Sequence, residues 1–145
     1  MSTQMNQNDS SELNTNGYTN SLSRNISANT PRTTLIAREG NTFIPLRAKQ
    51  IAVFYSLKKE VIAIDFSGNR FHIDQSLTDI ETSVESNVFF RVNRNIILHF
   101  EAIRLFRVVE FGKIIVDLVQ PEWLEEEVHI SQYRAPRFRE WISNV

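Results

Sequence analysis

The chain has 145 residues and no cysteine, which excludes disulfide bonds, thiolate metal sites and a cysteine nucleophile. The absence of cysteine also fits a reducing compartment. Only four glycines are present and they are spread along the chain, so no glycine-rich loop that cradles phosphates can form. The nucleophile motif G-x-S-x-G is missing as well. Enzymes built on these devices are therefore excluded.

Long apolar runs are also missing. None approaches the ~20 residues that a membrane-spanning helix needs. The N-terminus, MSTQMNQNDS, lacks the basic and apolar regions of a secretory signal, so we expect a cytoplasmic protein with no membrane partner. The formal net charge is only -1, so any nucleic-acid-binding face must arise from uneven placement of charges.

The three histidines do not form a recognisable site. His72, His99 and His129 lie far apart in the sequence, and none belongs to a metal-binding motif such as H-x-x-x-H. Strand histidines with satisfied hydrogen bonds are the simpler interpretation. We therefore expect no enzyme and no cofactor, and a metal- or histidine-based enzyme is the least favoured hypothesis.

The composition changes near residue 34. Residues 1–34 are dominated by Asn, Ser and Thr and contain only isolated apolar side chains, which predicts a disordered tail or linker. Residues 35–145 form the predicted domain. Its pattern is mostly β, with antiparallel sheets, one short central helix near residues 77–84 and a short C-terminal helix. The predicted strands cover residues 43–46, 51–56, 61–66, 70–74, 88–92, 96–99, 103–119 and 128–130. Residues 51–56 and 61–66 form one predicted hairpin, and residues 103–119 contain another.

Basic residues gather in loops or at the ends of these elements. They form three clusters: Lys58 with Lys59, Arg91 with Arg94, and Arg134 with Arg137 and Arg139. Charges are common in loops because loops are solvated, and Arg91 on an apolar strand fits a half-buried ion-pair partner. Together, however, the clusters indicate a nucleic-acid-binding face separated from the acidic stretch 125–127. Arginine can bind guanine, asparagine can bind adenine, and lysine reaches phosphates.

Four segments, in order, resemble the LytTR family of DNA-binding domains. FFRVNRNIILHFEAIRLF (89–106) is similar to the family signature, in which a strand ends in a short polar loop, most often His-Arg-Ser. The other three segments are IPLRAKQIAVFYS (44–56), SLTDIETSV (76–84) and VHISQYRAPRFREWI (128–142). The resemblance spans nearly all of residues 35–145. It implies a fold of antiparallel β-sheets with short helices, which binds duplex DNA through loops.

The resemblance also implies which residues contact DNA. They are Lys58 and Lys59 in the early hairpin, Asn93, Arg94 and Asn95 in the polar loop, and Gln132, Tyr133 and Arg134 after the terminal serine. Asn93 and Asn95 replace the usual His and Ser, whereas Arg94 is retained as the base-contacting residue. A turn held together by asparagine side chains is the alternative for Asn93 and Asn95.

Such a domain would serve a bacterial transcription regulator that binds double-stranded DNA sequence-specifically. Regulators of this family often carry a receiver domain, so the resemblance allows a stand-alone regulator or the output domain of a two-component response regulator. Family members tend to bind paired direct repeats as dimers, so repeated promoter elements and a homodimer are implied. The alternative is a non-enzymatic protein-interaction module that uses β-edges or the C-terminal tail.

Overall fold

The computed structural model describes residues 34–145. The tail or linker predicted for residues 1–34 lies, except for Thr34, outside the described residues. The strands are β1 (Thr34–Glu39), β2 (Thr42–Arg47), β3 (Ile51–Leu57), β4 (Glu60–Asp65), β5 (Arg70–Ile73), β6 (Phe89–Asn93), β7 (Ile96–His99), β8 (Ile103–Val108), β9 (Ile114–Leu118) and β10 (Val128–Ile130). The helices are α1 (Leu77–Ser83) and α2 (Ala135–Asn144), with short 3-10 turns η2 (Ala48–Gln50), η3 (Phe100–Ala102), η4 (Glu110–Gly112) and η5 (Pro121–Trp123).

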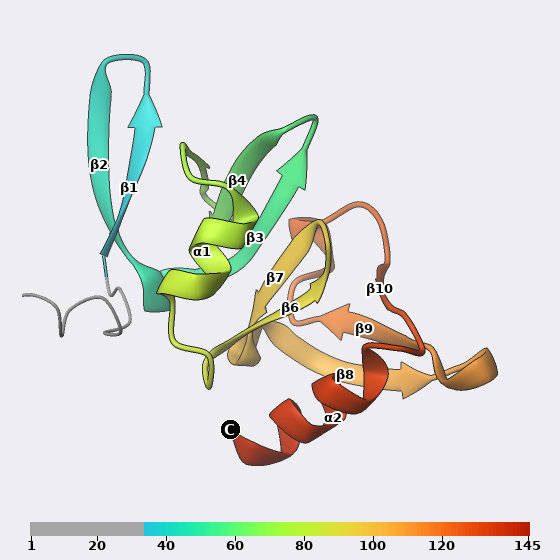
Figure 1. Cartoon of the computed structure of the whole chain (residues 1–145). Coiled ribbons are helices and arrows are strands. Elements are labelled where there is room, and N and C mark those ends of the chain that lie inside the picture. The colour runs from blue at the N-terminus through green and yellow to red at the C-terminus, as the bar shows by residue number, and fades with distance from the viewer. Residues whose placement is uncertain (1–33) are drawn as a thin grey trace, which may run out of the picture. The chain divides into compact units, whose positions relative to one another are not determined.

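The strands form two antiparallel sheets (Figure 1). The larger sheet has seven strands in the order β2-β1-β5-β4-β3-β7-β6, and the smaller has three in the order β10-β9-β8. Pro45 lies in β2, at the edge of the large sheet, where its missing N–H costs no ladder hydrogen bond. The prediction of a mostly β chain with two short helices is confirmed, although the sequence did not predict the division into two sheets.

Two apolar cores lie on the two sides of the large sheet. One contains Phe54 and Ile80 of α1, and the other joins Val53 to Phe138 of α2 and to the small sheet. Since both faces of β3 are covered, its first four residues are all buried, and an unbroken apolar run replaces the usual alternation. Phe138 is fully buried and packs edge to face on Phe106, with ring centroids 5.2 Å apart. These contacts fix α2 beside the small sheet.

The central helix begins as its sequence predicts. Ser76 is the N-cap residue, and its side chain accepts a hydrogen bond of 3.1 Å from the Asp79 N–H. Leu77 and Ile80 are buried on one face of α1. The opposite face carries Thr78 and Glu81, which reach the strand that leads to the polar loop. The helix therefore both covers a core and supports the candidate site.

Candidate functional site

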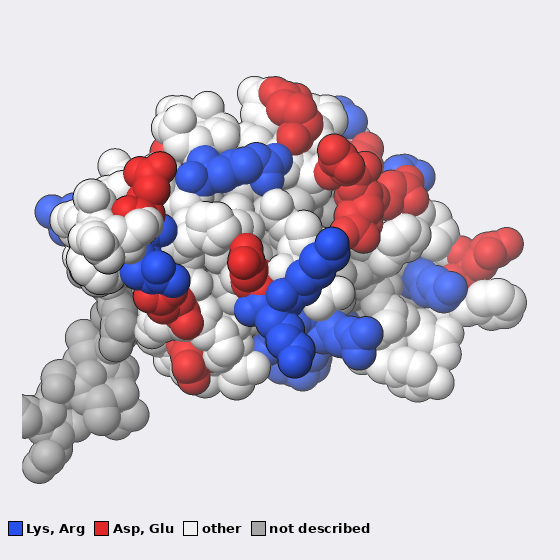
Figure 2. Space-filling model, turned by 90° about the horizontal axis from the view of Figure 1, so that it is seen from above, with Lys and Arg blue, Asp and Glu red and all other residues white. Residues whose placement is uncertain are grey.

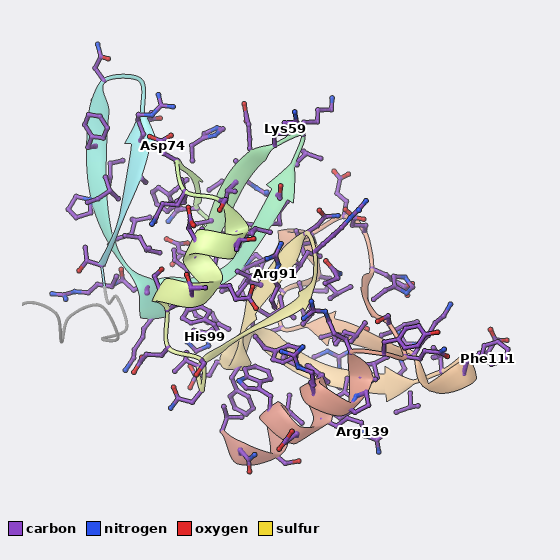
Figure 3. All side chains as sticks on the ribbon, in the orientation of Figure 1. Lys59, Asp74, Arg91, His99, Phe111 and Arg139 are labelled. Carbon is purple, nitrogen blue, oxygen red and sulfur yellow. The ribbon has the colours of Figure 1, made fainter. Side chains whose placement is uncertain are left out.

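The hairpin between β3 and β4 ends in two lysines. Leu57 pairs with Glu60, so Lys58 and Lys59 alone form the turn, and both have positive φ angles, 53° and 71°. This is the geometry of a tight type I′ turn, which favours asparagine and glycine. Both lysines are exposed, and neither forms an ion pair with another residue of the described range. Figure 3 shows Lys59 at the tip of the hairpin.

The polar loop is a two-residue turn between β6 and β7, held by the side chain of Asn93. Its Oδ1 accepts a hydrogen bond of 2.8 Å from the Asn95 N–H, and its Nδ2 donates one of 3.0 Å to the His129 carbonyl oxygen. The register between β6 and β7 shifts between Arg91 and Asn93, as in a β-bulge. The Asn93 side chain thus makes hydrogen bonds both within the turn and to β10, whereas Arg94 and Asn95 are exposed.

Arg91 holds the same turn from the other side. Its Nη2 donates a hydrogen bond of 2.6 Å to the Arg94 carbonyl oxygen. Its Nη1 binds the Thr78 hydroxyl at 3.1 Å and the Glu81 carboxylate at 3.2 Å. The side chain is only 16% exposed. The interpretation of Arg91 as a half-buried ion-pair partner is therefore confirmed, and the guanidinium also connects α1 to the turn.

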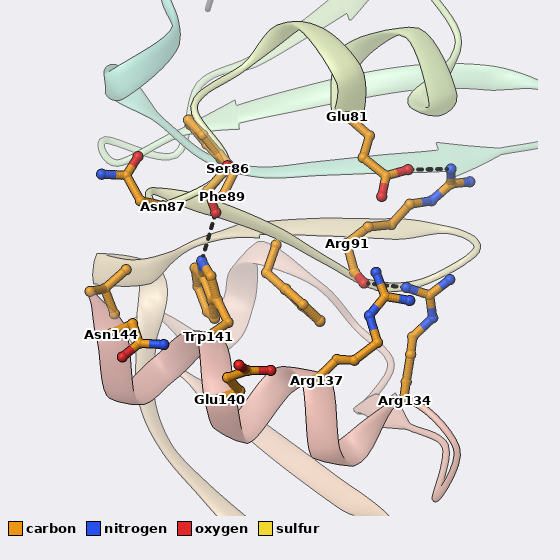
Figure 4. A pocket seen from close by; sticks show the side chains of 12 residues that line it. Glu81, Ser86, Asn87, Phe89, Arg91, Arg134, Arg137, Glu140, Trp141 and Asn144 are labelled. Atoms are coloured by element: carbon orange, nitrogen blue, oxygen red, sulfur yellow. Dashed lines mark hydrogen bonds and ion pairs between the residues drawn. The ribbon is translucent and has the colours of Figure 1, made fainter.

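The third predicted segment precedes α2. Gln132 and Tyr133 are exposed, Tyr133 to 84%. Arg134 is half-buried, and its Nη1 donates a hydrogen bond of 3.1 Å to the Arg91 carbonyl oxygen (Figure 4). The Ser131 hydroxyl accepts a hydrogen bond of 3.2 Å from the Arg134 N–H and shapes the entry to the helix. The Arg134 guanidinium thus joins this segment to β6, the strand that leads into the polar loop.

The three predicted segments are joined by hydrogen bonds. The Ser56 N–H, at the end of β3, donates a bond of 2.9 Å to the Asn95 carbonyl oxygen, so the lysine hairpin adjoins the polar loop. Arg134 joins the third segment to the second through Arg91. Residues distant in the sequence are therefore brought into one region by the pairing of β3 with β7 and by the position of α2.

A shallow groove of about 500 Å³ runs beside the polar loop, and acidic residues line it too. Arg94 and Lys113 share the groove with Glu126 and Glu127. The expectation that the basic face is separated from the acidic stretch 125–127 is therefore wrong. The loop before β10 lies against the turn because Asn93 binds the His129 carbonyl oxygen. Figure 2 shows acidic and basic side chains intermixed on the face that carries the hairpin tip.

Several residues of this groove were not among the predicted site residues, and Lys113 and His129 are the two that bear a basic group. Lys113 follows the turn between β8 and β9, and nothing in the sequence around it indicates a site. His129 lies 3.3 Å from Glu127, measured from Nε2 to Oε1, and its position in the groove depends on the pairing of β10 with β9. A pairing between distant strands is not readable from local sequence.

Other site types lack support in the described range. Within residues 34–145 no group of three or more His, Cys, Asp or Glu side chains could hold a metal ion. His99 is buried, and its Nδ1 accepts a hydrogen bond of 2.9 Å from the Glu101 N–H, which matches a structural histidine. None of the helices in this part of the chain is long and apolar enough to cross a membrane.

Comparison with known proteins agrees with the fold. A family model described as the LytTr DNA-binding domain matches residues 41–143. Among solved structures, the chain is similar to the LytTr DNA-binding domain of a methyl-accepting/DNA response regulator from Bacillus cereus. The TM-score is 0.65 at 16% sequence identity, and the match covers 77% of this chain and 97% of that one. No curated protein matches the sequence.

Proposed function

The chain belongs to the LytTr DNA-binding domain family, and we propose that it recognises duplex DNA sequence-specifically through three loops. The observation that carries this proposal is the exposure of the Arg94 side chain on a turn whose backbone is held in place. Its backbone is held by Arg91 at 2.6 Å, while its side chain is exposed and has no hydrogen bond or ion pair with another described residue. Because the backbone of the turn is already held, binding needs to order only the side chain, and the guanidinium fork matches guanine O6 and N7.

The lysine hairpin supplies the electrostatic contribution. Lys58 and Lys59 are exposed on the hairpin that adjoins the polar loop, a position suited to contacts with phosphates of the same duplex. With a net charge of -1, the chain as a whole does not attract DNA, so affinity depends on such local charges. Binding should therefore weaken with salt by roughly one unit of log-log slope for each phosphate contact.

The segment before α2 completes the proposed interface. Gln132 and Tyr133 are exposed, so they can make polar or stacking contacts with a groove. Arg134 keeps one guanidinium nitrogen on the Arg91 carbonyl oxygen, which fixes its direction and leaves other donors for a phosphate or base. Asn95 is exposed next to Arg94 and can contact DNA directly, whereas Asn93 contributes to binding by fixing the shape of the turn.

The biological role that follows is regulation of transcription in a bacterium, with the protein in the cytoplasm. The chain would act as a stand-alone regulator or as the output domain of a two-component response regulator. We further propose that it binds repeated promoter elements as a homodimer. None of these roles requires a catalytic residue or a cofactor.

The experiment that tests the proposal is selection of binding sites from random duplex DNA with the full chain. We expect a repeated motif to be enriched over successive rounds. Titration of the enriched duplex and of a scrambled duplex should then give a difference in affinity that persists as salt is raised. Failure to enrich any motif, with equal binding to all duplexes, would contradict sequence-specific recognition by this chain.

A further inference from the structure

The tip of the β8–β9 hairpin carries a phenylalanine that nothing in the fold accounts for. Phe111 is 81% exposed and has a φ angle of 61°. A bulky side chain in this left-handed region is strained, and such strain is most often found at functional positions. Figure 3 shows Phe111 at the end of the projecting hairpin, and Val108, on the adjoining strand, is 52% exposed. Phe111 belongs to none of the three proposed DNA-binding loops.

A pocket of about 420 Å³ lies between β6 and α2 (Figure 4). One wall is aromatic: Phe90 and Trp141 are stacked with ring centroids 5.2 Å apart. The Trp141 Nε1–H donates a hydrogen bond of 2.9 Å to the Ser86 carbonyl oxygen, so the indole is fixed in place. A preformed aromatic wall of this kind suits an inserted ring, which would pack against it edge to face or offset.

The charges of the pocket favour a carboxylate next to that ring. Five charged side chains line it: Arg91, Arg134, Arg137, Glu81 and Glu140. Arg91 is paired with Glu81 at 3.2 Å. Neither Arg134 nor Arg137 forms an ion pair with another residue of the described range. The guanidinium group of Arg137 is therefore available to pair with a carboxylate that enters the pocket.

We propose that the pocket receives the hairpin tip of a second copy of the chain, with Phe111 against the aromatic wall and Glu110 beside Arg137. The tip offers a ring for the aromatic wall and a carboxylate for Arg137, since the exposed Glu110 directly precedes the exposed Phe111. Tip and pocket consist of different residues, so one molecule can use both. The contact is heterologous, and copies associate head to tail.

Such a contact buries little more than one aromatic side chain and the residues around it. Interfaces of this size are weak, so we expect self-association with a dissociation constant on the order of 0.1 mM. The ring contributes most of the affinity, and the ion pair selects the orientation. The contact does not depend on DNA binding, and it adds to the proposed function a means of linking neighbouring copies.

Sedimentation of the full chain between about 10 µM and 1 mM tests the proposal. Phe111→Asn keeps a residue that tolerates the left-handed region, so the fold is retained, and we expect association to weaken by at least about tenfold. Glu110→Arg and Arg137→Glu should each weaken association as well. An equimolar mixture of these two variants should restore it, because each supplies the partner charge that the other needs.

Arg139→Glu is the matched control. It makes the same charge change on α2, but Arg139 does not line the pocket, and we expect association to stay unchanged. A wild-type chain that remains monomeric at about 1 mM overturns the proposal. So does a Phe111→Asn variant that associates as the wild type does, or a mixture of the two charge variants that fails to associate.

Discussion

The guanidinium of Arg91 donates a hydrogen bond of 2.6 Å to the carbonyl oxygen of Arg94, so one arginine holds the backbone of another. The first is 16% exposed and lies in β6, and the second is exposed on the turn that follows. Through Thr78 and Glu81 the same guanidinium is anchored to α1. The proposed base-reading side chain is thus set on a turn that the helix indirectly supports.

Replacing Arg91 by lysine should impair DNA recognition without removing a contact to DNA. An ammonium group lacks the planar fork, so it cannot bind Glu81 and the Arg94 carbonyl oxygen together in the same geometry. We expect the free energy of unfolding to fall by about 1–3 kcal/mol. Preference for the selected duplex over scrambled DNA should fall as well. Urea unfolding and anisotropy titrations measure the two effects.

Arg94→Ala is the control for stability, because its side chain has no hydrogen bond with another described residue. Its unfolding free energy should match that of the wild type. Normal recognition by the Arg91→Lys variant would contradict the role assigned to Arg91.

The lysine hairpin should show opposite effects on stability and binding. Lys58→Asn with Lys59→Gly supplies the residues that a type I′ turn prefers, so the free energy of unfolding should rise by about 1–2 kcal/mol. Loss of two positive charges should weaken binding to all duplexes and reduce the salt slope by about one unit per lost phosphate contact. Thermal unfolding and salt titrations measure these changes.

The matched variant for this pair is Lys58→Gln with Lys59→Gln, which removes the charge and keeps the unfavourable backbone. It should bind as weakly as the first variant without the gain in stability. Binding that remains at the wild-type level in both variants would exclude the hairpin from the interface.

The two asparagines of the loop should differ sharply. Asn93→Asp keeps the acceptor for the Asn95 N–H but places an oxygen opposite the His129 carbonyl oxygen, 3.0 Å from the present Nδ2. We expect the free energy of unfolding to fall by about 1–2 kcal/mol. Asn95→Ala should leave stability unchanged, since its side chain is exposed and makes no hydrogen bond within the described range. Equal stability of the two variants in urea would contradict this division.

Much of this fold is readable from local sequence. Ser67-Gly68-Asn69 predicts a turn between strands, and the Asp65 side chain accepts hydrogen bonds from the N–H groups of Ser67 and Asn69 there. The capping residue Ser76 and the apolar spacing of Leu77 and Ile80 predict α1. Turns, caps and periodicity depend on neighbouring residues, so short segments contain the necessary information.

The site depends on contacts that local sequence does not contain. Asn93 binds a carbonyl oxygen 36 residues away, and Arg134 binds one 43 residues away. Both acceptors are backbone carbonyl oxygens, which every residue has. No side-chain pattern in the sequence can therefore mark these partners. The position of Glu126 and Glu127 beside Arg94 has the same origin, which is why the sequence suggested a separate acidic surface.

His99 should make stability depend on pH between neutrality and mild acid. Burial lowers the pKa of His99, against a smaller opposing effect of Glu101. Its ring packs edge to face on Phe66 and Phe89, with centroids 5.1 Å away in both cases. Above the unfolded-state pKa of about 6.5 the neutral ring carries no penalty. As pH falls through and below that value the unfolded chain binds the proton first, so stability decreases.

Urea unfolding at several pH values between about 5 and 8 measures this slope. His99→Asn keeps a side chain that can cap η3 but does not titrate, so its slope in this range should be smaller than that of the wild type. A wild-type slope that persists in His99→Asn would assign the effect to other groups.

The most direct test of the central claim is an anisotropy titration of wild type and Arg94→Ala against the selected duplex and its scrambled counterpart at two salt concentrations. We expect the variant to lose about 1–3 kcal/mol of binding free energy on the selected duplex and little on scrambled DNA, at both salt concentrations. A negligible loss, or an equal loss on the two duplexes, would contradict base recognition by Arg94.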